Sequence, residues 1–227
     1  MVLGIITSIA ACPAIIGTTE AIQQGQRQNK REQFRSGKSN LLVTCSDPSK
    51  KATDIHGGSI VLKDGKLYAT TVNPKAKFPA DSHPEADQDR PNQTGHLFAG
   101  YFFPYPDKKW GRKGDGYVTT IADDPPQLNW VFIDKDTYEV RYGLRKDSES
   151  HLVGPWTCTP IDRRLTFDGW EGFMVVETEQ DNGIWQLYFD VDDDGLDYKV
   201  PMDKRVMEVE LTRKELRMKK GDPIIVG

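Results

Sequence analysis

The sequence predicts an all-β domain, an antiparallel β-sandwich or barrel of about nine to ten strands, with an N-terminal α-helical extension. From residue 40 onward, short runs of alternating apolar and polar residues are separated by turn residues, as is typical of antiparallel strands. No segment after residue 40 keeps the 3.6-residue period of a long helix, which argues against a βαβ sheet. The 227 residues, 37% of them hydrophobic, are enough for one core or two small ones. We therefore expect a helical segment over residues 1–38 and a β-rich globular domain over 39–227.

The predicted strands follow one another along the β-rich domain. Residues 59–63 and 66–70 flank Asp64-Gly65, the strongest hairpin signal in the chain. A second turn, containing Asn182-Gly183, separates strands expected at 173–178 and 184–190. The other expected strands are 41–46, 97–103, 117–121, 128–133, 138–142, 152–159 and 206–212. No internal sequence repeat is visible, and residues 73–95 form the one long predicted loop.

The charge is distributed unevenly along the chain. There are 30 Lys and Arg against 34 Asp and Glu, a net charge of −4. Residues 1–40 carry five basic and two acidic side chains, whereas the remainder carries 25 basic and 32 acidic. The β-rich domain therefore lacks the basic face that a nucleic-acid partner requires. We expect an anionic partner to meet the N-terminal segment instead.

Three cysteines, Cys12, Cys45 and Cys158, do not make the even, dense set of a disulfide scaffold. Cys45 and Cys158 each share a strand face with apolar residues, which predicts buried thiols. A Cys45–Cys158 disulfide is the alternative in an oxidising compartment. The odd cysteine count makes a secreted protein less favoured than a cytoplasmic one, for which the N-terminal segment adds the option of peripheral membrane association.

The first 19 residues carry no charged side chain, and a basic stretch follows them. Isoleucines recur at helical spacing, while Pro13 divides the predicted helix into two pieces. The residues expected to contact a membrane surface or another copy of the chain are Ile5, Ile9, Ile16, Arg27, Lys30 and Arg31. The segment lacks the positive start of a signal peptide, and its apolar stretch is short and interrupted for a membrane span. The sequence predicts two alternatives equally: a helix at an anionic membrane surface or in an oligomer, and a helix packed on the β-domain.

An acidic run suggests a calcium site. Asp190, Asp192 and Asp194 precede Gly195 in a D-x-D-x-D-G pattern, and Ca²⁺ is bound by several oxygen ligands. However, Pro201 stands where an EF-hand needs its final glutamate, and no helix is predicted on either side. The alternative is an acidic turn that leaves a strand. No other cofactor is expected.

Loop residues supply the remaining candidates. Asp168 and Glu171 bracket a Gly-Trp pair and are the weak candidates for a pair of hydrolytic carboxylates. Trp110 and Trp170 lie on predicted loops, where an aromatic ring can contact a sugar or a protein partner. Phosphate-binding, dinucleotide-binding and serine-nucleophile motifs are absent from the sequence, which makes an enzyme the less favoured class.

Several segments together resemble a large family of filamentous-fungal (ascomycete) proteins that has no assigned activity. They are GIITS at 4–8, QQGQ at 23–26, AGYFFPYPD at 99–107, DPPQLNW at 124–130, FDGWEGF at 167–173 and YFDVDDDG at 188–195. The resemblance implies a fungal origin and transfers no site residue.

The sequence as a whole favours a non-enzymatic interaction or scaffold protein. Its β-domain would bind a partner or another copy, and its N-terminal helix would contact a membrane surface or an oligomer. A calcium-assisted carbohydrate-binding module and a small hydrolase-like enzyme are the alternatives.

Overall fold

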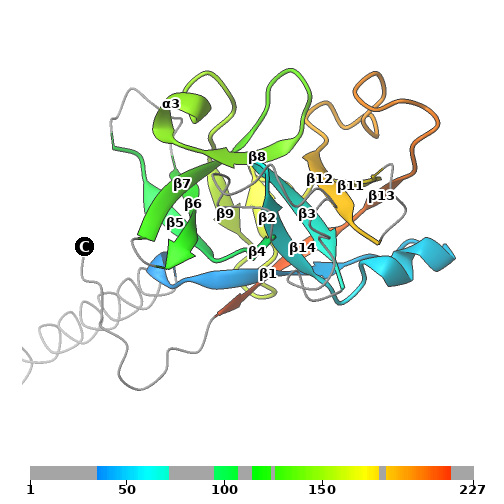
Figure 1. The fold of residues 1–227 in the computed structure, drawn as a ribbon, viewed down its shortest axis with the longest axis horizontal. Helices are drawn as coiled ribbons and strands as arrows, with labels where there is room; N and C mark the ends of the chain where they lie inside the picture. The colour runs from blue at the N-terminus through cyan, green and yellow to red at the C-terminus, as the bar shows by residue number, and fades with distance from the viewer. Residues whose placement is uncertain (1–34, 72–94, 107–113, 124–125, 179–182, 216–227) are drawn as a thin grey trace, which may run out of the picture. The chain divides into compact units, whose positions relative to one another are not determined.

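Antiparallel strands build the fold in the computed structural model (Figure 1), which describes residues 35–71, 95–106, 114–123, 126–178 and 183–215. The strands are β1 (Ser39–Thr44), β2 (Ser59–Lys63), β3 (Lys66–Thr70), β4 (His96–Leu97), β5 (Gly100–Pro104), β6 (Asp115–Asp123), β7 (Pro126–Ile133), β8 (Val140–Gly143), β9 (Trp156–Cys158), β10 (Leu165–Phe167), β11 (Phe173–Glu177), β12 (Trp185–Phe189), β13 (Val206–Glu208) and β14 (Glu210–Glu215). The described helices are short: the 3-10 helix η1 (Lys50–Asp54) and the α-helix α3 (Arg145–Ser148). The predicted N-terminal helix lies outside the described residues.

The strands form three successive units of similar construction. The first contains β1, the hairpin β2–β3, and the consecutive strands β4 and β5. The second contains β6, the hairpin β7–β8, and β9. The third contains β10, the hairpin β11–β12, and the consecutive strands β13 and β14. Each unit therefore has a first strand, a hairpin and a last strand, although no repeat is visible in the sequence.

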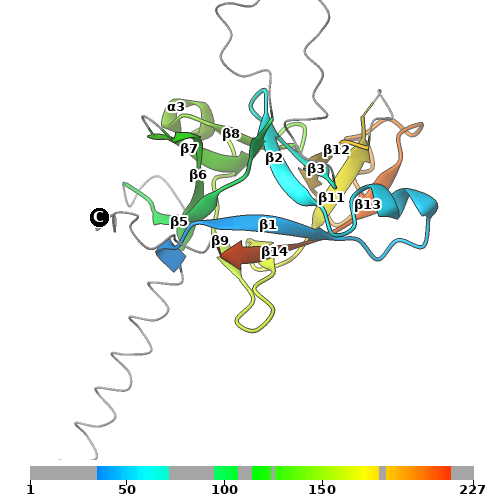
Figure 2. The same cartoon turned by 60° about the horizontal axis from the view of Figure 1, so that its bottom comes forward.

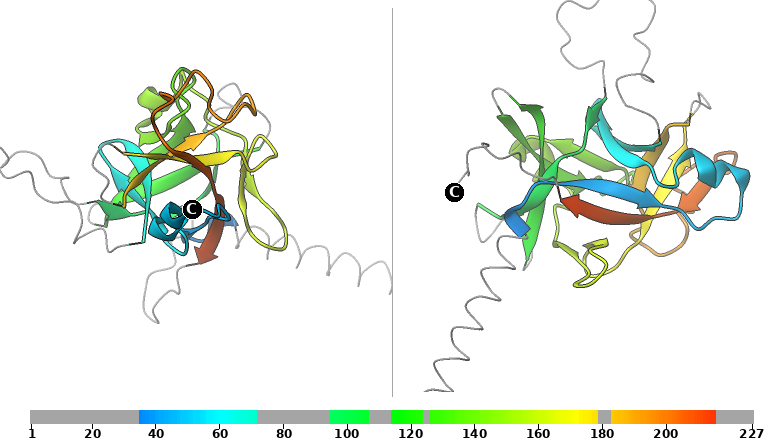
Figure 3. Two further views of the ribbon diagram at one scale, coloured as in Figure 1. Left: turned by 90° about the vertical axis from the view of Figure 1, so that its right-hand side faces the viewer. Right: turned by 90° about the horizontal axis from the view of Figure 1, so that it is seen from below.

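The first and last strands of the three units close into a barrel. The circuit runs β1–β5–β6–β9–β10–β14 and returns to β1 through the ladder from Ser39↔Glu215 to Thr44↔Glu210. The bridge between Arg164, which precedes β10, and Thr212 of β14 completes it. A larger circuit of seven strands, β1–β5–β6–β7–β8–β3–β2, also closes. Closure leaves these strands without a free edge, and Figure 3 shows the barrel from two further sides.

The three hairpins pair with one another and cover one end of the barrel. Strand β3 pairs with β8 at Lys66↔Arg141 and with β12 at Trp185↔Ala69, and Glu139 bridges to Tyr188 between β8 and β12. An isolated two-stranded hairpin is marginally stable at best in water. Here each hairpin is stabilised by its pairing with the other two.

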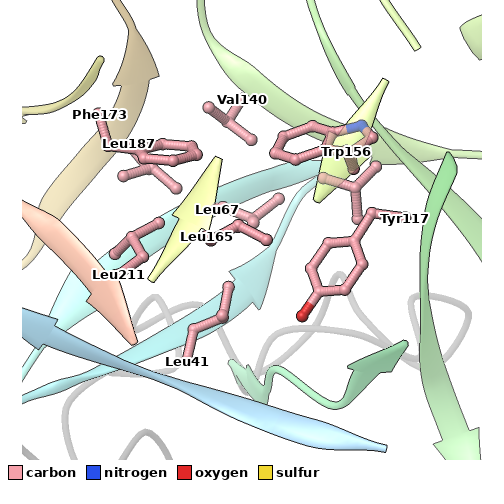
Figure 4. A pocket seen from close by; sticks show the side chains of 10 residues that line it. Leu41, Leu67, Tyr117, Val140, Trp156, Leu165, Phe173, Leu187 and Leu211 are labelled. Atoms are coloured by element: carbon pink, nitrogen blue, oxygen red, sulfur yellow. The ribbon is translucent and has the colours of Figure 1, made fainter. Parts of the chain in front are cut away.

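The main core is one close-packed cluster to which all three units contribute. Its centre is lined by Leu41, Leu67, Tyr117, Val131, Val140, Trp156, Leu165, Phe173, Leu187 and Leu211 (Figure 4). Leu41, Tyr117 and Leu165 come from the first strand of each unit, and no room for a water molecule remains among these described side chains. Full burial of one such side chain stabilises the fold by roughly 1.5–3 kcal/mol.

The all-β prediction is confirmed, and the structure decides for a barrel. The Asp64-Gly65 turn is also confirmed, since both residues have the positive φ of a tight hairpin turn (49° and 76°). The number of strands was predicted too low. The stretches at 97–103 and 206–212 are each divided because the chain changes its partner strand within them, and β10 was not predicted at all. Most of the predicted 73–95 loop lies outside the described residues.

Leu165→Ala should reduce the free energy of unfolding by about 2–5 kcal/mol, because it leaves a cavity between all three units. The measurement is urea denaturation followed by tryptophan fluorescence. The control is Ile161→Ala in the turn before β10, which should change stability by less than about 0.5 kcal/mol, since Ile161 is 85% exposed. Equal effects of the two substitutions would contradict this account of the core.

Candidate functional site

The connection between β12 and β13 folds into a lobe of its own, residues 190–205, which we call the acidic lobe (orange in Figure 1). It begins at Asp190, which is 4% exposed. The Asp190 carboxylate accepts hydrogen bonds from the backbone N–H groups of Asp194 (3.2 Å) and Gly195 (2.7 Å). These bonds close the first turn of the lobe and fix its direction as it leaves the sheet.

Tyr138, in the turn between β7 and β8, packs against the acidic lobe. Its ring belongs to a small apolar cluster with Val176 and Leu196, and its hydroxyl donates a hydrogen bond to the Asp192 carboxylate at 2.6 Å. The Lys199 ammonium lies 4.0 Å from the centre of the Tyr138 ring, a cation–π contact. The hydrogen bond to Asp192, together with burial, raises the pKa of Tyr138 to about 12.

Backbone strain shapes the outer part of the lobe. Asp193, Leu196 and Tyr198 have φ of 55°, 66° and 66°, the left-handed region that costs a non-glycine residue roughly 1–2 kcal/mol. In this conformation Leu196 is buried at 1% exposure, while Tyr198 is 99% and Met202 102% exposed. The packing of Leu196 thus holds a backbone that presents two large side chains to solvent. Strain of this kind is concentrated at functional sites.

The turn at residues 168–172 adjoins the acidic lobe. The Trp170 ring meets Phe189 edge-on at 5.3 Å and stays 36% exposed. Gly172 makes room for this ring, since a Cβ at that position would come 2.4 Å from it. The Gly172 carbonyl accepts the backbone N–H of Asp190 at 2.8 Å, which joins the turn to the lobe. The fold therefore brings together Trp170 and the acidic run, which were separate predictions.

The predicted carboxylate pair lies on the same turn. The Glu171 carboxylate forms an ion pair with Arg164 at 3.0 Å, and Arg164 also lies 3.6 Å from Glu210. Asp168 is exposed, has a φ of 49° and donates its backbone N–H to the Pro155 carbonyl. Glu171 thus takes part in a structural ion pair, and a catalytic role for Asp168 and Glu171 stays a prediction.

The calcium proposal for Asp190, Asp192 and Asp194 also stays a prediction. Both oxygens of Asp190 accept backbone hydrogen bonds, and Asp192 accepts the hydroxyl of Tyr138. Within the described parts of the chain, no three His, Cys, Asp or Glu side chains are grouped closely enough to hold a metal ion. An ion at this turn would have to share oxygens that already serve the fold.

The structure describes the predicted cysteines Cys45 and Cys158 but not the predicted contact residues of the N-terminal segment or Trp110. Cys45 is buried, as predicted, and burial raises the pKa of its thiol, whereas Cys158 is only half-buried; both are free thiols. The predicted contact residues Trp110, Ile5, Ile9, Ile16, Arg27, Lys30 and Arg31 lie outside the described residues. Among the residues that are described, no helix is long and apolar enough to cross a bilayer. The supporting Tyr138 and the exposed Tyr198 and Met202 were not predicted, because no periodic pattern marks them.

Asp134 organises the turn that carries Tyr138. It is 6% exposed and accepts the backbone N–H groups of Asp136 (3.0 Å) and Thr137 (3.2 Å) and the guanidinium of Arg141 (3.2 Å). Burial alone would raise the pKa of the Asp134 carboxyl, but these hydrogen bonds and the charge of His151 hold it below its usual value.

Acid should weaken this support. Because the pKa of Asp134 is lowered in the folded state, its contribution to stability is fully present above the unfolded-state pKa of about 4 and is lost as the pH falls through the folded-state pKa. Asp134→Asn should therefore destabilise the protein at pH 7 and flatten the loss of stability below pH ~4. Denaturant titrations across this pH range measure both effects. Asp136→Asn, at an exposed neighbour, is the control, and parallel pH curves for Asp134→Asn and the unsubstituted protein would contradict the assignment.

Comparison with known proteins identifies the family and nothing beyond it. No curated protein and no solved structure matches the chain. A family model described as a fungal beta-trefoil domain matches residues 17–217. A trefoil is an arrangement of three similar units, and the barrel described above is built from three such units. The match also confirms the resemblance to fungal proteins. The chain belongs to the fungal beta-trefoil domain family.

Proposed function

We propose that this chain is a non-enzymatic interaction protein whose β-domain binds a protein partner through the acidic lobe. The observation that carries the proposal is the full exposure of Tyr198 and Met202 on a lobe whose backbone is held in place. Tyrosine and methionine are enriched in protein interfaces, and a contact that is already ordered loses little entropy on binding. The β-trefoil fold is compatible with such a binding or scaffold role.

Charge narrows the chemistry of the partner. The lobe contains six aspartates, at 190, 192, 193, 194, 197 and 203, against Lys199, Lys204 and Arg205. A surface with excess negative charge and exposed large side chains suits a protein segment that is basic and partly apolar. Trp170, at the edge of the same surface, supplies a further aromatic contact.

A photo-reactive phenylalanine analogue at position 198 should crosslink to the partner in cells that contain it. The matched control carries the analogue at Lys146, an exposed residue of α3. Irradiation of the purified chain alone shows whether the partner is a second copy. Crosslinking of equal extent from positions 198 and 146 would contradict a binding role for the lobe.

The proposal includes attachment of the protein to an anionic membrane surface by its N-terminal segment, with a peripheral cytoplasmic location. The support comes from the sequence: the segment has an uncharged, isoleucine-rich part followed by Arg27, Lys30 and Arg31. Apolar side chains bind at the headgroup boundary, while basic side chains are attracted by anionic lipid. The alternative contact of this segment is with another copy of the chain.

Full-length protein should float with vesicles that contain phosphatidylserine and not with neutral vesicles. Replacing Arg27, Lys30 and Arg31 together by Gln should reduce the floating fraction at least about tenfold, because each basic residue near an anionic surface contributes about 1 kcal/mol. High salt should weaken the binding of the unsubstituted protein. Flotation that depends on neither salt nor these residues would contradict electrostatic attachment.

Calcium-assisted carbohydrate binding is a second candidate, favoured by the junction of the Trp170 turn with the acidic lobe. An exposed aromatic face beside carboxylates offers stacking together with oxygen ligands. A calorimetric titration of the protein with Ca²⁺, followed by thermal unfolding with the ion present, tests the first step. No heat and no thermal shift would remove this candidate.

A further inference from the structure

One lysine of the acidic lobe is bound on the aromatic ring against which the lobe packs. The Lys199 ammonium lies 4.0 Å from the centre of the Tyr138 ring and donates a hydrogen bond to the backbone carbonyl of Asp136 at 3.1 Å. Lys199 comes from the lobe, which Figure 2 shows in orange on the side of the barrel where β12 and β13 lie. Asp136 and Tyr138 belong instead to the turn between β7 and β8. The ring and the carbonyl thus hold an ammonium group, and we call them the ammonium site.

Three features of the ammonium site attract a positive charge. The face of an aromatic ring carries negative charge density, which attracts a cation within about 6 Å of the ring centre. The Tyr138 hydroxyl donates to the Asp192 carboxylate at 2.6 Å, and this bond polarises the ring further. The backbone carbonyl of Asp136 directs the negative end of its dipole at the ammonium. The site therefore suits the ammonium or guanidinium group of a basic side chain.

Lys199 is held in this site by the ring and the carbonyl and not by a carboxylate. Within the parts of the chain that the structure describes, its ammonium forms no ion pair with an Asp or Glu. The Lys199 side chain is half-buried and borders solvent, whereas Tyr138, whose ring it contacts, is 8% exposed. A cation–π contact at such a position is weak, equivalent to about a two- to fivefold change in an equilibrium constant. Another basic side chain can therefore replace Lys199 on the ring.

We propose that the ammonium site binds a lysine or arginine side chain of the protein partner, and that Lys199 occupies the site while the partner is absent. The inference rests on the binding role proposed for the acidic lobe and names the group of the partner that the lobe recognises. Lys199 adjoins the exposed Tyr198 in sequence, so a partner that contacts Tyr198 lies close to the site. The aspartates of the lobe attract the same positive charge from a distance. Lys199 is thus a competitor of the partner, and its removal strengthens binding.

The test is fluorescence anisotropy of the full-length chain with a labelled hexapeptide in which lysine and leucine alternate. Lys199→Gln removes the competing ammonium and should tighten the binding of this peptide about fivefold. The matched control is Lys135→Gln, which removes the same charge from an exposed residue next to Asp136 in sequence. Because an exposed charge is screened by salt, the control should change the affinity less than about twofold. A second peptide, with glutamine in place of each lysine, should bind none of the variants.

The aromatic ring is tested in the chain that carries Lys199→Gln. Tyr138→Phe keeps the ring and should keep most of the gain in affinity, whereas Tyr138→Leu removes the ring and should abolish the gain. Thermal unfolding of each variant shows whether the lobe and the barrel remain folded, since Tyr138 also packs against Leu196. Equal binding by folded Tyr138→Leu and Tyr138→Phe variants would overturn the role of the ring. If Tyr138→Leu does not fold, the comparison of Lys199→Gln with Lys135→Gln decides.

The outcomes separate this inference from the proposed function. Equal affinities of Lys199→Gln and Lys135→Gln would show that Lys199 does not compete, and weaker binding by Lys199→Gln would make Lys199 a support of the lobe. Either result overturns the ammonium site, while the partner-binding role of the lobe is decided by the crosslink from position 198. If the peptide binds as expected but position 198 crosslinks no more than position 146, the ammonium site stands and the role of Tyr198 is wrong. A chain that binds the lysine peptide in none of these variants overturns the inference.

Discussion

Aromatic packing around Trp156 is the interaction on which the rest of the structure depends. Trp156 is fully buried, and its ring contacts Tyr117 at 5.8 Å, Phe167 at 4.9 Å and Phe173 at 6.3 Å. Tyr117 in turn meets Phe102 of the first unit at 5.0 Å, so one continuous set of rings joins all three units. The four strands of the second unit and the five strands of the first and of the third each supply only part of this set of rings. Each unit is stable because the other two complete its core.

This shared core explains which parts of the fold could be predicted from the sequence. The hairpin of β2 and β3 was predicted residue for residue, since two β-prone runs flank the residues Asp64 and Gly65, which favour the positive φ of a tight hairpin turn. Strand β10 has only three residues, which is too short a run for a strand pattern to be recognised in the sequence. The threefold construction could not be predicted either. Leu41, Tyr117 and Leu165 each come from the first strand of a unit, and the tyrosine differs in type from the two leucines, because the core constrains the space that a side chain fills and not its identity.

The candidate site was predictable in its parts and not in its assembly. Trp170 and Asp190 stood out separately, but only the pairing of Phe173 with Phe189 brings their turns together. The exposure of Tyr198 depends on a left-handed backbone that the packing of Leu196 maintains, and no sequence pattern encodes that packing. The lobe also has its own small apolar cluster, distinct from the main core. Surface substitutions there therefore test the proposed binding without removing the contacts that hold the barrel.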